Sequence, residues 1–289
     1  MVPILAMCSA LSHAVATVLI KMGLRNSNPF SAAFISLIAC FTGALILLLF
    51  SLPLSQFNGT CILYFAFAGI AGPWIGRLLF FTGVHRVGSS IASPLQSTKP
   101  MFSAVAAMLI LGEALTLPIV SGTVIMVLGL VIISSDQEGG QQGRAWSKKD
   151  LLFPLMAGAS YGIGHIFRKI GLNTYPSAVT GLVVQNAAAL TLFALSATMR
   201  GRRPPGTSPR DARPWLLFSL SGCFTLLGQL TLLLALEYGT VVIVSPLSSI
   251  NPLFVFILVS LFLRRTERVT WRLVVGAVLI ITAAAVLVL

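Results

Sequence analysis

The sequence predicts an all-α integral membrane protein whose ten transmembrane helices form two inverted five-helix repeats. Three observations support this fold class. Of the 289 residues, 56% are hydrophobic and only 9% are charged, whereas a soluble domain carries roughly 25% charged residues. Apolar stretches of about 20 residues, the length that spans a bilayer, recur ten times. Finally, motifs in the first half of the chain return in the second half.

Proline, glycine, asparagine or charged residues separate the apolar stretches. The breaks at 84–88 and 237–239 are short polar hinges, so the helices on either side of them have the least defined limits. The first stretch lacks the basic n-region and the small-residue cleavage pattern of a signal peptide, and we interpret it as a helix. The predicted helices cover residues 2–22, 31–51, 61–84, 89–111, 116–134, 150–172, 176–199, 213–238, 239–263 and 270–289.

A polar linker at 136–149 divides the chain into two five-helix repeats, 1–135 and 150–289. The segment SPLQSTKP at 93–100 corresponds to SPLSSINP at 245–252. Lys21 and Lys169 close the first and sixth predicted helices in matching KxGL motifs, and Glu113 and Glu267 follow the fourth and ninth. Because five is odd, the second repeat enters the membrane from the opposite side, an architecture of many secondary transporters. Chance similarity among apolar segments is the alternative, and the shared SP-x5-P frame argues against it.

These features resemble the drug/metabolite transporter superfamily, EamA type. The stretch GVHRVGSSIASP at 83–94 is similar to the junction between the third and fourth helices of that family, and LILGE at 109–113 to the end of its fourth helix. The resemblance covers nearly the whole chain. It implies a membrane transporter and says almost nothing about the substrate.

The positive charges favour one side of the membrane. Fifteen of the 19 Lys and Arg fall in loops after odd-numbered predicted helices, and loops after even-numbered helices hold at most Arg168 and Lys169. The positive-inside rule therefore predicts that the odd loops are cytoplasmic and both termini outside, in a multi-pass protein of the cell (inner) membrane. Several members of the superfamily have the opposite orientation. The sequon at Asn58 would face outward, but it lies so close to a helix end that an accidental match is the better interpretation.

Lys99 is the predicted principal anion-binding residue, because it lies in the middle of the fourth predicted helix. Insertion scales make a lysine there roughly 2.5–3.5 kcal/mol unfavourable, so it should face a wet cavity. The alternative is that Lys99 only caps carbonyls that Pro100 frees. We expect four prolines to break the fourth and ninth helices and to act as hinges: Pro94, Pro100, Pro246 and Pro252.

Other charged and aromatic residues extend the candidate site. Trp74 and Arg77 share a helix face at spacing i, i+3, although Arg77 has enough reach to snorkel to the interface. Tyr161, His165 and Arg168 form a polar stripe at i, i+4 and i+7. His13 matches Tyr161 in the repeat, and we expect His13 and His165 to carry protons or to bond between helices. The remaining candidates are amides and a hydroxyl that either contact substrate or join helices: Gln96, Gln185, Asn186, Gln229, Ser248 and Asn251.

The sequence also limits the function classes. No Asp or Glu falls within a predicted helix core, and no catalytic triad, phosphate loop or metal-ligand cluster is present. We therefore expect no enzyme, no cofactor and no metal. The net charge of +12 forms no continuous basic face, which argues against nucleic acid as a partner. The four cysteines lie in apolar surroundings and are predicted to be reduced packing residues.

The leading hypothesis is a secondary transporter of a small polar metabolite that carries a carboxylate or phosphate. Its partners would be this anionic or zwitterionic solute and the lipid bilayer, with a homodimer left open. An exporter of aromatic amino acids or drug-like solutes is the alternative within transport. A lipid-carrier partner or membrane scaffold without transport activity is the alternative from another class.

Overall fold

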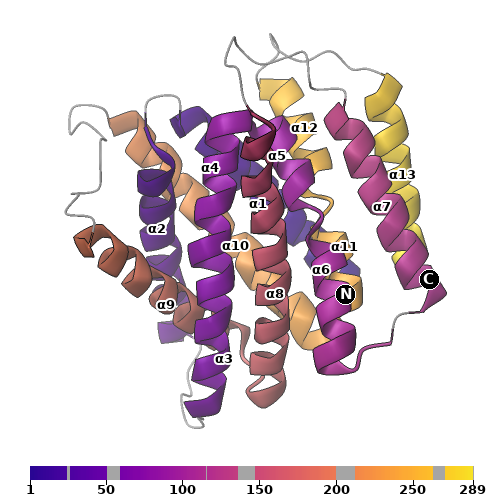
Figure 1. Ribbon diagram of the computed structural model, residues 1–289. Helices are drawn as coiled ribbons and strands as arrows, with labels where there is room; N and C mark the ends of the chain where they lie inside the picture. The colour runs from indigo at the N-terminus through magenta and orange to yellow at the C-terminus, as the bar shows by residue number, and fades with distance from the viewer. Residues whose placement is uncertain are drawn as a thin grey trace.

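The computed structural model describes residues 1–24, 27–50, 59–114, 116–135, 147–199, 212–262 and 271–288, and every regular element in these ranges is a helix (Figure 1). Several sequence predictions lie outside the described residues: most of the 136–149 linker, the basic loop 200–211, and the positions of Asn58, Glu267 and Leu289.

Most predicted helix limits agree with the structure to within a few residues. The helices of the first half are α1 Val2–Gly23, α2 Pro29–Phe50, α3 Gly59–Gly69, the π-helix η2 Ile70–Gly76, α4 Arg77–Val87, α5 Ser89–Gln96, α6 Lys99–Ala106, the π-helix η3 Ala107–Leu111 and α7 Leu117–Ser135. Those of the second half are the 3₁₀ turn η4 Lys148–Leu151, α8 Leu152–Thr174, α9 Ala178–Met199, α10 Ala212–Tyr238, α11 Val241–Ser248, α12 Asn251–Phe262 and α13 Trp271–Val288.

Within the described residues, six helices are long and apolar enough to cross a membrane. By length and composition, these helices support a multi-pass membrane protein. The 23-residue α8 is not among the six. α8 carries the polar stripe with His165 and Arg168. Other helices cover this stripe, since both residues are buried, so it does not face lipid.

The two proline-framed segments are interrupted at equivalent places. α5 ends at Gln96 and α6 begins at Lys99, while α11 ends at Ser248 and α12 begins at Asn251. In the first break the Thr98 N–H reaches back three residues to the Leu95 carbonyl (3.3 Å). In the second break Ser249 and Ile250 do the same, to the carbonyls of Pro246 (2.8 Å) and Leu247 (3.4 Å). Pro100 and Pro252 therefore lie at the breaks, whereas Pro94 and Pro246 lie inside α5 and α11 and do not interrupt them. Movement about these breaks stays a prediction.

The π-helical segment η2 was not predicted. It holds Pro73, which has no N–H and whose ring clashes with a carbonyl one turn earlier in a regular α-helix. A wider π turn accommodates such a residue and is frequent at functional sites. Here it directly precedes Arg77.

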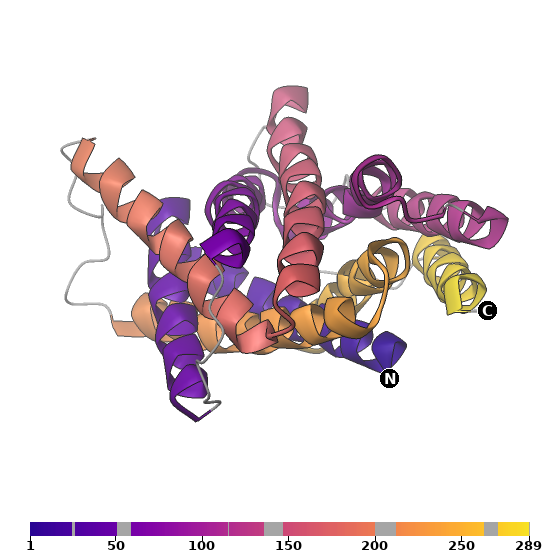
Figure 2. The same ribbon diagram turned by 90° about the horizontal axis from the view of Figure 1, so that it is seen from below.

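The helices pack in two bundles, and each bundle contains helices from both halves of the sequence. α1 packs on α10, α11 and α12, and α2 packs on α10; we call this set the α1 bundle. α8 packs on α3, η2, α4, α5, α6 and η3, and α9 packs on α3; this set is the α8 bundle. α2 and α9 also pack on each other across the two bundles. α7 and α13 pair with each other at one edge of the molecule, as both views show (Figures 1 and 2). Each bundle thus combines helices from both halves.

Glycines bring α8 against the break between α5 and α6. A Cβ at Gly158 would lie 2.8 Å from the carbonyl oxygen of Gln96, and one at Gly162 would lie 2.9 Å from that of Lys99. Small residues of this kind let membrane helices approach closely.

The helix connections gather at two ends of the molecule. We call the end with residues 112–114, 175–177 and 239–240 the Glu113 end; it is the lower end in Figure 1. The opposite end, where η4 lies, is called the Asp150 end.

Candidate functional site

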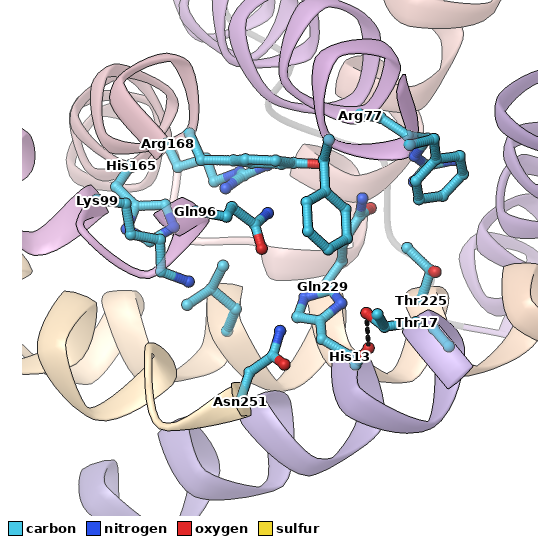
Figure 3. A pocket seen from close by; sticks show the side chains of 15 residues that line it. His13, Thr17, Arg77, Gln96, Lys99, His165, Arg168, Thr225, Gln229 and Asn251 are labelled. Carbon is cyan, nitrogen blue, oxygen red and sulfur yellow. Dashed lines mark hydrogen bonds between the residues drawn. The ribbon is translucent and has the colours of Figure 1, made fainter. Parts of the chain in front are cut away.

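A cavity of about 60 Å³ lies between the two bundles (Figure 3). Its lining comes from near the middle of the long helices, for example His13 of α1 and Thr225 of α10, and from the interruptions at Lys99 and Asn251. The cavity is therefore at the mid-height of the helices. The full lining is His13, Ala16, Thr17, Arg77, Phe80, Phe81, Gln96, Lys99, Tyr161, His165, Arg168, Thr225, Gln229, Leu232 and Asn251.

The structure brings most of the predicted site residues to this cavity. Nine of them line it: His13, Arg77, Gln96, Lys99, Tyr161, His165, Arg168, Gln229 and Asn251. Trp74 does not, since it packs against an apolar cluster that includes Phe80 and Phe81. Gln185, Asn186 and Ser248 are buried beside the lining rather than in it.

Arg77 is the least compensated cation of the site. Its side chain is 2% exposed, so it does not snorkel to an interface. Nη1 and Nη2 make no hydrogen bond within the described part of the chain. The Tyr161 hydroxyl and the Cys40 thiol lie within hydrogen-bonding reach of the guanidinium, but a hydroxyl and a thiol are neutral groups that supply no counter-charge. No carboxylate among the lining residues therefore balances the charge of this guanidinium at the cavity.

Arg168 is held by a network of amides behind the cavity wall. Its Nε donates to Gln185 Oε1 at 2.8 Å. Gln185 Nε2 and Asn186 Nδ2 donate to Gln229 Oε1 at 3.2 and 3.0 Å, and the Cys40 thiol lies 3.7 Å from the same oxygen. These contacts occupy the Gln229 carbonyl, which leaves its amide nitrogen for the cavity. Of the two roles considered for Gln185 and Asn186, these contacts favour joining helices, and substrate contact stays a prediction.

Lys99 reaches across the cavity to the other bundle. Its Nζ donates to the carbonyl oxygen of Ser248 at 3.4 Å, a long hydrogen bond to the negative end of the half-helix α11. This carbonyl lies four residues before Pro252 in the other bundle, so Lys99 caps a carbonyl there and not one that Pro100 frees in its own helix, as the alternative had it. An ammonium has three donors, and this single long bond leaves capacity for a ligand.

Both predicted histidines line the cavity, one from each bundle. His165 is 1% exposed, and its Nδ1 has no hydrogen-bond partner among the described residues. His13 fits against Gly228, where an added Cβ would lie 2.9 Å from the His13 ring. No Asp or Glu is in the lining, and the described residues contain no group of three or more His, Cys, Asp or Glu that could hold a metal.

The cavity combines residues at matching positions of the two sequence halves. Four such pairs line it: Arg77 with Gln229, Lys99 with Asn251, His13 with Tyr161, and Thr17 with His165.

The candidate list missed Phe80, Phe81 and Thr225. Their signal was available, because Phe80 and Phe81 follow Arg77 at i+3 and i+4 and Thr225 precedes Gln229 by four residues.

Comparison with known proteins identifies the family. A sequence profile described as the EamA-like transporter family matches residues 1–135 and 148–289. The chain belongs to the EamA-like transporter family. This family is part of the drug/metabolite transporter superfamily, so the resemblance inferred from the sequence motifs is confirmed.

Individual relatives agree with this family assignment. An uncharacterized transporter of Archaeoglobus fulgidus is 26% identical over 288 residues, covering 99% of this chain and 97% of the relative. An uncharacterized protein of Methanocaldococcus jannaschii is 35% identical over 60 residues, or 21% of this chain and 44% of that protein. A solved crystal structure, described only as that of a protein, superposes with a TM-score of 0.76 over 97% of this chain and 94% of its own, at 16% identity. The names of the family and the first relative indicate a transporter rather than an enzyme.

Proposed function

We propose that this EamA-like protein is a secondary transporter of a small solute that carries a carboxylate or phosphate. In this proposal ten helices cross the cell (inner) membrane as two inverted five-helix repeats, and the solute passes through the central cavity by alternating access. The observation that carries the proposal is the buried guanidinium of Arg77 with both terminal nitrogens unpaired.

The charge of the cavity supports an anionic solute. Arg77, Lys99 and Arg168 all line the cavity, and the lining has no acidic side chain. A buried cation without a counter-charge is strongly destabilising, and such residues within membrane proteins usually mark a substrate path. A carboxylate or phosphate would supply the missing charge and accept hydrogen bonds from Arg77 Nη1 and Nη2.

The volume of the cavity supports movement of the bundles. About 60 Å³ holds a few water molecules, whereas ligand pockets commonly have roughly 300–1,000 Å³. A metabolite would therefore fit only after the α1 and α8 bundles separate. That separation at one end at a time is what alternating access requires.

An aromatic amino acid is a second candidate for the solute. Phe80, Phe81 and Tyr161 line the cavity and offer apolar surface for a ring. Asn251 Oδ1 has no partner among the described residues and would accept a hydrogen bond from an ammonium. A scaffold without transport activity is less well supported, because it gives no reason for cations to converge on an internal cavity.

Transport into proteoliposomes tests the proposal directly. Purified protein would be reconstituted and offered labelled monocarboxylates, dicarboxylates, sugar phosphates and aromatic amino acids. We expect saturable uptake of an anionic solute, together with a rise in melting temperature on binding, since a ligand of the folded state stabilises it. Binding and uptake of aromatic amino acids alone would favour the second candidate, and neither response to any solute would contradict both.

The charge bias adds a prediction about orientation. We expect the basic loop from Arg200 to Arg213 to be cytoplasmic and the termini to face outward. A single cysteine at Ser208, in a background without the native cysteines, should resist an impermeant thiol reagent in intact cells. Ready labelling would reverse the orientation and leave the proposed solute class unaffected.

A further inference from the structure

The α1 and α8 bundles are joined at the Glu113 end by a carboxylate that binds a helix N-terminus. Glu113 follows η3 in the α8 bundle, and its two oxygens accept hydrogen bonds from the N–H groups of Val241 and Val242, each at 3.0 Å. These N–H groups begin α11 in the α1 bundle. The first N–H groups of a helix have no partner within it and carry partial positive charge, so a carboxylate there is stabilising.

A lysine makes the complementary contact on the other side of the same connection. Lys169, in the last turns of α8, donates to the carbonyl oxygens of Leu236 at 2.7 Å and Gly239 at 2.8 Å. These carbonyls end α10, where a helix carries partial negative charge. Two residues of the α8 bundle, the acidic Glu113 and the basic Lys169, thus hold the short connection between α10 and α11.

The line of contacts between the bundles continues from this end toward the cavity. Ser103 Oγ of α6 and Ser245 Oγ of α11 are 2.7 Å apart, and Lys99 donates to Ser248 one turn farther on. At the Asp150 end, by contrast, the ion pair of Arg86 with Asp150 joins α4 to the start of α8, within a single bundle. It places no restraint on separation of the bundles.

We propose that Glu113 and Lys169 form a gate that closes the Glu113 end of the cavity in this structure and opens when both contacts break. This gate rests on the proposed function, in which the two bundles separate at alternate ends. Both side chains are only partly buried. Water can therefore replace their hydrogen bonds as they part, which keeps the cost of opening low compared with that of a buried pair. The Ser103–Ser245 contact behind them would separate in the same movement.

The first test reads the accessibility of two positions on opposite sides of the gate. In a background without the native cysteines, Ser245→Cys reports the path from the Glu113 end, and Thr17→Cys reports the cavity from the α1 bundle toward the Asp150 end. Each is treated with an impermeant thiol reagent after reconstitution in nanodiscs. We expect Glu113→Gln or Lys169→Met to raise the reaction rate of Ser245→Cys about tenfold, the order expected for losing a hydrogen bond to a charged group. The rate of Thr17→Cys should fall at the same time.

The pair of reporters separates gating from loosening of the fold. Opposite changes at the two reporters support the gate, and unchanged rates at both overturn it. Increases at both would mean that the variants only loosen the protein, which also overturns it. Lys148→Met, a cationic residue at the Asp150 end that makes no contact between the bundles, is the matched control and should leave both rates unchanged.

The second test locks the gate in place. The two hydroxyl oxygens at 2.7 Å put the sulfurs of a Ser103→Cys/Ser245→Cys variant within reach of a disulfide bond of about 2.05 Å. Copper-catalysed oxidation by oxygen should then lower solute uptake at least about tenfold, and a thiol reductant should restore the uptake. Each single-cysteine variant should be insensitive to the oxidant. Full uptake by the cross-linked protein would overturn the gate.

A failure of the proposed function is distinguishable from a failure of the gate. If no anionic solute binds or enters the wild-type vesicles, the solute class is wrong, yet the two accessibility reporters still measure whether Glu113 and Lys169 control the opening. If anions raise the melting temperature of the Glu113→Gln variant as they do for wild type but neither reporter moves, the binding site stands and the gate fails.

Discussion

The two sequence halves contribute matching positions to one cavity but give them different chemistry. Arg77 and Lys99 from the first half correspond to Gln229 and Asn251 from the second, and all four line the cavity. The interruption of the helix is the same at Lys99 and Asn251, so it does not depend on charge. The repeated backbone therefore creates the cavity, whereas the cations of the first half make the cavity positively charged.

The largest effect should come from replacing Arg77 with the residue type of its counterpart. Arg77→Gln removes the two unpaired donors, and truncating a buried charged partner of a ligand costs about 2–5 kcal/mol, or roughly 30-fold or more in affinity. Uptake of the anionic solute should fall by that factor, while the melting temperature should stay the same or rise because an unpaired buried charge is lost.

Arg86→Gln is the matched control for Arg77→Gln. Both arginines are on α4, but Arg86 is 51% exposed in its side chain and pairs with Asp150 away from the cavity. Its loss should leave uptake near the wild-type level. Equal losses in the two variants would show that the effect follows net charge on α4 rather than the cavity.

Lys99→Gln makes the second position of the first half resemble Asn251. Folding and expression should persist, since the second half already has a neutral amide at the equivalent break. Anion uptake should fall at least about tenfold, somewhat less than for Arg77→Gln because Lys99 already donates to the Ser248 carbonyl. Lys99→Arg should retain part of the uptake if charge alone matters, and a wild-type rate for Lys99→Gln would reduce Lys99 to a carbonyl cap.

How far the sequence predicted this arrangement depends on the kind of contact involved. Lys99 and Arg77 were found because a cation in an apolar stretch is costly wherever the helix packs. Trp74 was misplaced, because its shared face with Arg77 was inferred from regular α-helical spacing, while the π-helical η2 with Pro73 changes the spacing there. Glu113 was noticed only as a repeat marker and as the end of the LILGE stretch, with no partner predicted for it. Its partners at Val241 and Val242 are 128 and 129 residues away, and local patterns carry no information on that contact.

The two proline-framed breaks offer a smaller and symmetric test. Pro100→Ala and Pro252→Ala each return an N–H to the backbone, and hydrogen bonds within membrane proteins are worth on average about 0.6 kcal/mol, or roughly threefold in a rate. If the breaks are equivalent hinges, both variants should slow uptake by about that factor and slow amide hydrogen exchange at 95–101 or 247–253. An effect confined to Pro100 would tie the break to the charged half instead.

The smallest effect should come from the ion pair at the Asp150 end, which serves neither the cavity nor the contacts between the bundles. The Ser147 N–H donates to Asp150 Oδ2 at 2.9 Å, and Arg86 Nη1 donates to Oδ1 at 2.6 Å. The backbone N–H and then the guanidinium hold the pKa of Asp150 below its ordinary value of 3.8.

A carboxyl with a depressed folded-state pKa contributes stability above its unfolded pKa, and that contribution is lost as the pH falls from about 4 through the lower folded value. Asp150→Asn should therefore lower the melting temperature in detergent by about 2 °C or less at pH 7, with the difference from wild type vanishing at strongly acidic pH and shrinking in high salt. A difference that persists unchanged below pH 3 would mean that the ionised carboxylate is not what stabilises the start of α8.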